Sequence, residues 1–234
     1  RVVGRNSGVQ TSGLIFAGML APGATTNITE IWNGTNWTEV NDLNTARFYL
    51  GSAGATTDNT TSLGFGGDPS PPSSIGNTES WNGSSWTEVN DLNTARRQLM
   101  GAGIQTSALA FGGENPGAAT LADTESWNGS SWTDVADLRT ATRTSGSAGS
   151  SNSNALGFGG SSDSARTESW NGSVWTESTD LNVARNNIVG AGSNTSALAF
   201  SGNTPSANVA FTEAWNANVA VGAWFTGGNL NTAR

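Results

Sequence analysis

The sequence predicts an all-β protein, a five-bladed β-propeller made of four-stranded antiparallel blades. The main observation is a phrase that runs from Thr78 to Arg96 and recurs in close variants that start at Thr29, Thr124, Thr167 and Thr212. A spacing of 40 to 50 residues is typical of propellers and solenoids. The composition agrees, because 31 Gly, 10 Trp and only 12% charged residues favour many short strands joined by turns.

The third copy shows how one repeat divides into strands. The segment from Arg97 to Gly103 leads into a turn at 104–106, and the compact apolar run Ser107–Phe111 predicts the second strand. Gly112 and Gly113 end this strand, and a polar loop follows over 114–122. The first half of each repeat is therefore a pair of inner strands.

The second half of the repeat predicts a hairpin and a link. Strands are expected at Thr124–Trp127 and at Ser131–Val135, with Asn128-Gly129 between them as the signal for a type I′ turn. Residues 136–142 then lead to the next copy. One domain over residues 1–234 follows, with blades at about 1–46, 47–95, 96–141, 142–184 and 185–234.

Aromatic residues recur at fixed positions in every copy. They are expected to form the structural core between neighbouring blades, because large aromatic side chains suit the packing of one sheet on another. The core set is Phe16, Phe65, Phe111, Phe158, Phe200, Trp32, Trp81, Trp127, Trp170 and Trp215. The second Trp of each copy stands at 37, 86, 132, 175 and 224, and the last hairpin is irregular because its two Trp residues lie further apart.

This pattern of an Arg, an apolar strand ending in a Gly pair, a variable loop, an aromatic residue and a later Trp resembles the kelch repeat. The first aromatic is Trp where kelch repeats usually have Tyr. Tandem copies rich in Asn, Ser and Thr and without Lys also resemble the kelch-like repeats of bacteriophage tail-fibre and virion proteins. The resemblance implies that the innermost strand follows the Arg and that the outermost strand holds the second Trp. It also implies a ring closed by blade-to-blade packing.

The recurrent Arg position is held by Arg1, Arg47, Arg96, Arg185 and Arg234, whereas Thr142 takes it in the fourth blade. The chain therefore starts and stops at the same phase of the repeat, as expected of a piece of a longer protein or of a chain cut to whole repeats. A targeting signal outside the sequence stays open.

Composition argues against several classes of function. The sequence has no His, no Cys and no Lys, so thiol chemistry, copper oxidase chemistry and most transition-metal sites lack their ligands. The net charge of −8 argues against nucleic acid as a partner, and no apolar run is long enough for membrane insertion. We expect no cofactor and no metal, with calcium on loop oxygens left open.

Acids recur in every copy, as Glu30, Glu79, Glu125, Glu168 and Glu213 show. A glycosidase needs two unlike carboxylates in the central funnel, and acids at one repeated position instead suggest scaffolding or pairing with the recurrent Arg. We therefore expect no enzyme, and rank a glycosidase last among the hypotheses.

The loops after the second strands differ in length and sequence, and variable loops on a fixed scaffold are where recognition is commonly found. The first hypothesis is a non-catalytic module, outside a cell or on a virion, that binds a glycan or a surface protein. The second is a structural spacer of a fibre, with other copies or domains of a longer protein as partners. The candidate ligand-binding residues are Arg47, Arg96, Arg185, Asp68, Glu114, Asn115, Asp163 and Asn203.

Overall fold

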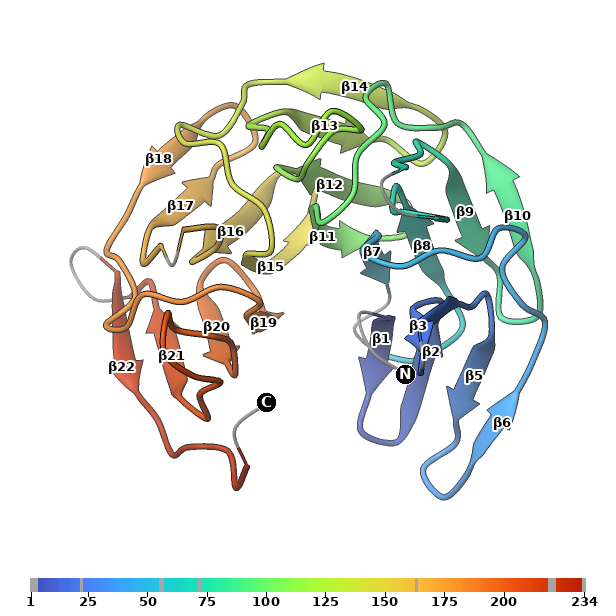
Figure 1. Ribbon diagram of the computed structural model, residues 1–234, viewed down its shortest axis with the longest axis horizontal. Coiled ribbons are helices and arrows are strands. Elements are labelled where there is room, and N and C mark those ends of the chain that lie inside the picture. Colours follow the sequence, from blue (N-terminus) through green and yellow to red (C-terminus); the bar gives the residue numbers. More distant parts are fainter. Residues whose placement is uncertain are drawn as a thin grey trace.

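The computed structural model describes residues 4–21, 23–54, 57–70, 73–162, 164–218 and 222–232. These residues contain strands and turns but no helix, and so none of them forms a helix that could cross a membrane. Five four-stranded antiparallel sheets are arranged around a central channel (Figure 1). The predicted fold class, a five-bladed β-propeller, is confirmed.

The strands of each blade follow the chain from the channel outwards. Blade 1 consists of β1 (Arg5–Val9), β2 (Ser12–Phe16), β5 (Thr29–Trp32) and β6 (Trp37–Glu39). Blade 2 consists of β7 (Gly51–Gly54), β8 (Ser62–Phe65), β9 (Thr78–Trp81) and β10 (Trp86–Val89). Blade 3 consists of β11 (Met100–Ile104), β12 (Ser107–Phe111), β13 (Thr124–Trp127) and β14 (Trp132–Val135). Blade 4 consists of β15 (Gly146–Ser151), β16 (Asn154–Phe158), β17 (Thr167–Trp170) and β18 (Trp175–Glu177). Blade 5 consists of β19 (Val189–Gly192), β20 (Ser196–Phe200), β21 (Thr212–Asn216) and β22 (Ala223–Thr226).

A small extra hairpin lies in the first variable loop. It pairs β3 (Met19–Leu20) with β4 (Ala24–Thr25), within a segment that the sequence analysis treats as a loop. The five sheets themselves follow the expected order, with the strand after each recurrent Arg innermost and the strand with the second Trp outermost.

Neighbouring blades meet along seams that repeat one aromatic contact. The Phe at the end of the second strand packs against the outer Trp of the next blade, with ring centroids 4.7 Å apart for Phe16–Trp86 and 4.9 Å apart for Phe65–Trp132. The outer Trp also donates its indole N–H to a Thr of the preceding blade, as Trp132 does to Thr78 Oγ1 at 3.0 Å. The same hydrogen bond occurs at 3.0 Å in Trp86–Thr29, Trp175–Thr124 and Trp224–Thr167. This geometry satisfies the polar end of each ring while its apolar body is buried.

A buried carboxylate forms the second recurrent contact of each seam. Glu79 Oε2 accepts the backbone N–H of Asn44 at 2.7 Å, and Glu125 Oε2 accepts that of Asn93 at 2.7 Å. Each link between blades is thereby held by a Glu on the third strand of the next blade. The recurrent acids are scaffold elements, as their repeated position predicts.

The Asn-Gly hairpins fold differently from the prediction. A type I′ turn needs positive φ at both central residues, yet only Gly129 has it, at 97°, and Asn128 does not. The Asn128 side chain instead accepts the backbone N–H groups of Ser130 and Ser131 at 2.9 and 3.0 Å, which closes a four-residue loop between the paired strands. The turn type was therefore wrong because the Asn side chain acts as the cap.

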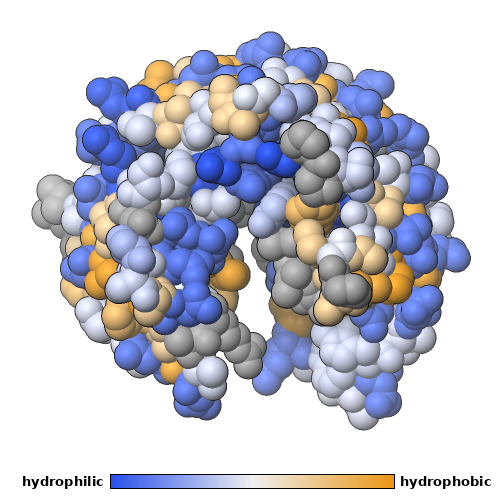
Figure 2. Space-filling view, viewed as in Figure 1, coloured by the Kyte–Doolittle hydropathy of each residue, from blue (hydrophilic) through white to orange (hydrophobic). Residues whose placement is uncertain are grey.

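The expectation that the last blade packs on the first is not met by the described residues. Figure 1 shows an opening between blades 5 and 1, and Figure 2 shows the channel continuing into it as a notch. Trp37, the outer Trp of blade 1, is 51% exposed, whereas its counterpart Trp132 is 6% exposed. Leu198 on blade 5 is 44% exposed, although its counterpart Leu109 is fully buried. We call this gap the opening.

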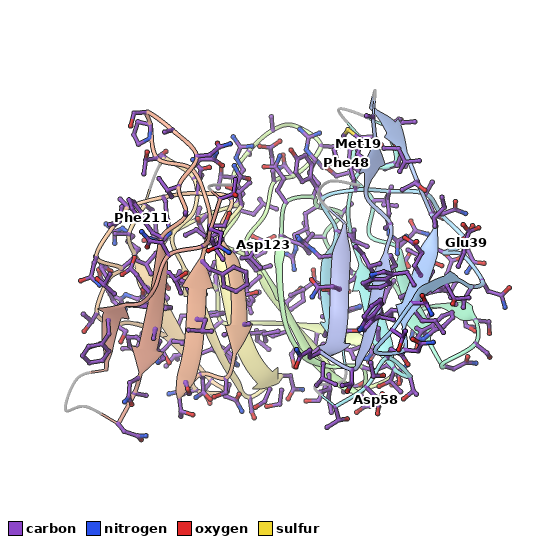
Figure 3. The ribbon with its side chains drawn as sticks, turned by 90° about the horizontal axis from the view of Figure 1, so that it is seen from below. Met19, Glu39, Phe48, Asp58, Asp123 and Phe211 are labelled. Carbon is purple, nitrogen blue, oxygen red and sulfur yellow. The ribbon has the colours of Figure 1, made fainter. Side chains whose placement is uncertain are left out.

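Two ends of the propeller differ in character. We call the end that carries the links between blades and the loops after the second strands the loop end. Met19 and Phe48 lie at this end, and Asp58, in a turn between the two inner strands of blade 2, lies at the other (Figure 3). The expected placement of links and variable loops on one face is confirmed by their pairing, as in the backbone hydrogen bonds between Phe48 and Asp68.

Candidate functional site

Two positions in each of blades 2 to 5 meet at the loop end and hold different side chains in different blades. One position follows the recurrent Arg site, and the other follows the Gly pair; the backbones of the two hydrogen-bond to each other. The pairs are Phe48 with Asp68, Arg97 with Glu114, Arg143 with Ser161, and Asn186 with Asn203. We call these paired positions the rim. Its backbone geometry is the same in these blades, whereas the type of side chain changes from blade to blade.

Charged residues of blades 2 to 4 form a connected network at this rim. Arg97 donates to Asp68 Oδ2 at 2.6 Å and to Glu114 Oε1 at 2.5 Å. Arg143 reaches Glu114 Oε2 at 2.5 Å and Gln98 Oε1 at 2.8 Å. Figure 2 shows hydrophilic residues gathered beside the channel on this face. The network joins side chains of three consecutive blades.

Burial and pairing act in opposite directions on Arg97. Burial lowers its pKa, but the hydrogen bonds and charges of Glu114 and Asp68 outweigh burial and raise the pKa above its ordinary value. Asp68 is fully buried, and its Oδ1 has no hydrogen-bond partner. The side chain of the network most accessible to a ligand is Arg143, which is 36% exposed.

An amide cluster occupies the same rim on blade 5. Asn187 donates to the side-chain oxygens of Asn186 and Asn203 at 2.7 and 3.0 Å, and Asn203 donates in turn to Asn208 Oδ1. Asn187 and Asn208 are exposed. Amide groups in this arrangement present both donors and acceptors to hydroxyl-rich or peptide ligands.

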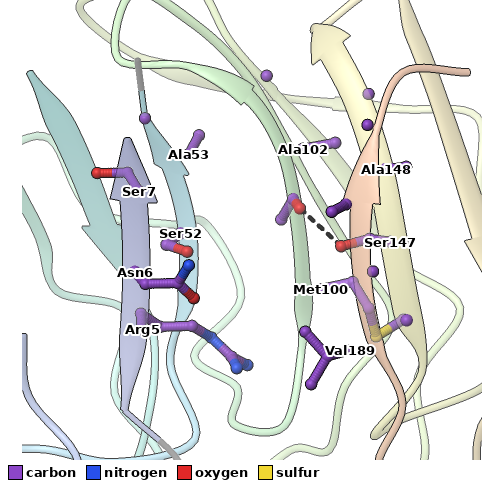
Figure 4. A pocket seen from close by; sticks show the side chains of 18 of the residues that line it. Arg5, Asn6, Ser7, Ser52, Ala53, Met100, Ala102, Ser147, Ala148 and Val189 are labelled. Atoms are coloured by element: carbon purple, nitrogen blue, oxygen red, sulfur yellow. Dashed lines mark hydrogen bonds between the residues drawn. The ribbon is translucent and has the colours of Figure 1, made fainter. Parts of the chain in front are cut away.

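The central channel holds a cavity of about 620 Å³ that is lined by described residues. Its walls are mainly Gly, Ala and Ser of the five inner strands (Figure 4). Arg5 is the single charged residue among the described residues of this lining. It donates to the carbonyls of Leu50 and Leu99, and burial lowers its pKa to about 10, so it stays protonated at neutral pH.

The predicted ligand-binding residues fall into separate groups. Arg47, Arg96 and Arg185 are fully buried beside Glu79, Glu125 and Glu213, so they do not face a ligand. Asp68 and Glu114 belong to the charged network and Asn203 to the amide cluster. Asn115 accepts the backbone N–H of Ala119 within its own loop, and Asp163 lies outside the described residues.

The sequence analysis missed Arg5, Arg97 and Arg143. Their signal was available, because each departs from the residue at the equivalent position of other blades. Arg97 and Arg143 directly follow the recurrent Arg site, where the second blade has Phe48 and the fifth has Asn186.

Among the described residues, no carboxylate lines the channel and no group of three or more acids could hold a metal ion. A comparison with models of known protein families finds no match, and a comparison with curated proteins finds no similar sequence. The functional proposal therefore rests on the geometry of the loop end and the channel.

Proposed function

We propose that this chain is a non-catalytic binding module that recognises a glycan or a surface protein through its loop end. The observation that supports this most is the rim, where one backbone geometry carries aromatic, charged and amide side chains in successive blades. Scaffold positions of the same repeats keep their residue type, as the Phe, Trp and Glu positions of the seams do. Different side chains on one constant backbone at an accessible face suit a recognition surface.

The chemistry of the rim favours a polar ligand. Arg143 offers a planar guanidinium that suits carboxylates and acidic sugars, and the neighbouring amide cluster suits hydroxyl groups. We further propose that the repeats are kelch-like and that the module works outside a cell or on a virion. The support for this is the sequence pattern of Arg, Gly pair, variable loop and paired Trp.

A structural role in a fibre is the second candidate, and the opening favours it. Exposed Trp37 and Leu198 lie on sheet faces that are buried in the other blades, and exposed apolar faces of this kind are typical of assembly surfaces. This role predicts self-association without a small ligand.

The test is binding of the folded, monodisperse chain to a glycan array that includes bacterial envelope polysaccharides. The double variant Arg143→Gln/Asn203→Ala should lose about tenfold or more in affinity for any captured glycan, because hot-spot contacts dominate binding. Its thermal midpoint should change little. Val174→Ala, an exposed change on a hairpin of the opposite end, is the matched control and should bind like the unmodified chain.

Equal binding by the double variant and the unmodified chain would contradict recognition through this rim. A blank array together with concentration-dependent oligomers in light scattering would favour the structural role.

A further inference from the structure

A second cavity lies in the seam between blades 3 and 4, at the place where the recurrent Arg is replaced by Thr142. Its volume is about 320 Å³. Its walls include Met100, Phe111 and Leu138 on the apolar side, and Gly157 and Glu168 on the polar side. It opens to solvent beside Ala141 and Ser162, which are exposed.

The equivalent seams show what normally fills this space. In blade 2, Arg47 lies 3.1 Å from Glu79 Oε1 and donates to the carbonyl of Gly64 at 3.3 Å. Arg96 in blade 3 makes the same two contacts with Glu125 and Ala110, at 3.1 and 3.3 Å. Arg185 in blade 5 makes them with Glu213 and Ala199, at 2.6 and 3.4 Å. The chain thus contains three internal examples of one guanidinium site.

Blade 4 keeps both acceptors of this site but lacks the guanidinium. Gly157 pairs with Glu168 across β16 and β17, as Gly64 pairs with Glu79 in blade 2, and both line the cavity. Glu168 is 6% exposed and is held by the backbone N–H groups of Arg139 and Thr140 at 2.8 and 3.1 Å. The carboxylate is therefore positioned as in the other blades.

Thr142 does not replace the missing contacts. Its hydroxyl hydrogen-bonds to the Ser145 hydroxyl at 2.9 Å, and Ser145 bonds to the carbonyl of Gly159 at 3.0 Å. Ser145 itself stands where the second, third and fifth blades have Leu50, Leu99 and Ile188. Two smaller side chains at once leave room in this seam.

Nearby cations do not fill the site either. Arg143 pairs with Glu114, and Arg166, on the cavity wall, pairs with Glu177 at 3.4 Å. The Arg139 side chain lowers the pKa of Glu168 at longer range, but among the described residues it forms no ion pair with it. A buried carboxylate without a paired cation is a costly arrangement that a bound cation relieves.

We propose that this cavity is a binding site for a guanidinium group, supplied by a small molecule or by an arginine side chain of a peptide. The ligand would take the place that Arg47, Arg96 and Arg185 occupy in their own seams. Its guanidinium would donate to Glu168 and to the Gly157 carbonyl, and its methylene groups would lie along Met100 and Leu138. Among the described residues this site shares Ser161 with the rim but neither Arg143 nor Asn203, the two residues changed in the test of the proposed function, so either proposal can fail without the other.

The pH dependence of binding follows from Glu168. Burial raises the pKa of this carboxyl, and nearby Glu177 raises it further. The backbone N–H groups of Arg139 and Thr140 and the charge of Arg139 lower it. The net effect is a pKa above the ordinary value of a glutamate. A protonated carboxyl no longer attracts a cation. Guanidinium binding is therefore full above this raised pKa and is lost as pH falls through it.

The test is titration of the full chain with methylguanidinium at millimolar concentrations, followed by calorimetry and by the thermal midpoint. Saturable binding with a rising midpoint is expected, because a ligand that binds only the folded state stabilises it. Methylammonium and sodium chloride at equal ionic strength are the controls. A parallel arm uses acetyl-Gly-Arg-Gly-amide: binding of either probe supports the site, and their relative affinities show whether the natural source is a small molecule or a peptide.

Two variants make the test specific. Thr142→Arg supplies the guanidinium from the chain and should abolish binding, and Arg96→Thr empties an equivalent seam and should add a second site whose lost stability methylguanidinium restores. Should Thr142→Arg fail to fold, Glu168→Gln serves instead and should weaken binding about tenfold or more at neutral pH. Absence of saturable binding to the unmodified chain, or equal binding by the unmodified chain and Thr142→Arg, would overturn the proposal.

Discussion

Replacing Arg47 by Met should lower the free energy of unfolding by about 3–5 kcal/mol, the usual cost of leaving one partner of a buried ion pair without the other. Arg47 is fully buried, 3.1 Å from Glu79. Burial lowers the pKa of Arg47 even though Glu79 acts against it, so desolvation of this pair is costly. Chemical denaturation followed by tryptophan fluorescence measures the change.

The double variant Arg47→Met/Glu79→Gln should regain part of that loss, because it removes both charges from the seam. Arg166→Ala is the exposed counterpart, since Arg166 and Glu177 are both more than half exposed, and it should cost less than about 1 kcal/mol. Equal effects of Arg47→Met and Arg166→Ala would refute the role of the recurrent Arg as a scaffold residue.

Trp132→Ala should cost about 3–5 kcal/mol, as expected for truncation of a buried aromatic side chain. Trp132 packs on Phe65 of the preceding blade and donates to Thr78 Oγ1 at 3.0 Å. Its loss leaves a cavity in the seam and removes the indole N–H that the Thr78 hydroxyl accepts, although that hydroxyl still donates to the Gly76 carbonyl at 3.4 Å. Thermal unfolding monitored by far-ultraviolet circular dichroism should show a clearly lower midpoint.

Trp37→Ala provides the matched control, because Trp37 holds the same repeat position in blade 1 but faces the opening. It is 51% exposed and, among the described residues, has no preceding blade to pack on. The expected loss is clearly smaller than that of Trp132→Ala, because about half of the Trp37 side chain is already exposed. A loss as large as that of Trp132→Ala would show that the opening is closed in solution.

The repeat made the fold predictable from sequence, because each copy predicts the same four strands and has aromatic residues at the same positions. Phe65 and Trp127 could be assigned to the core on that basis alone, and both are buried. The turn type at Asn128-Gly129 could not be predicted. The Asn128 side chain accepts hydrogen bonds from the backbone of the turn, and the dipeptide alone does not show this. The opening could not be predicted either, because blades 1 and 5 carry Phe and Trp residues at the same repeat positions as the blades that are packed on both sides.

The site was less predictable than the fold, since its contacts cross between blades. Nothing in the sequence pairs Arg97 with Asp68, which lies in the preceding blade. Arg47, Arg96 and Arg185 were selected because they recur, and they proved to be buried. The replacement of the recurrent Arg by Thr142 is visible in the sequence. That Glu168 thereby loses the guanidinium found beside the equivalent Glu of other blades could be seen only from the geometry of the seam.

The opening also governs how the molecule comes apart. In the part of the chain that the structure describes, four seams join the five blades into a linear array. Each blade is stabilised by its neighbours, and blade 3 has support on both sides while blades 1 and 5 have it on one. In such arrays local unfolding starts at the ends and proceeds inwards. The charged network of Arg97, Glu114 and Arg143 is centred on the unit that unfolds last. The charged network therefore keeps its shape even while the terminal blades fluctuate, whereas the amide cluster belongs to terminal blade 5.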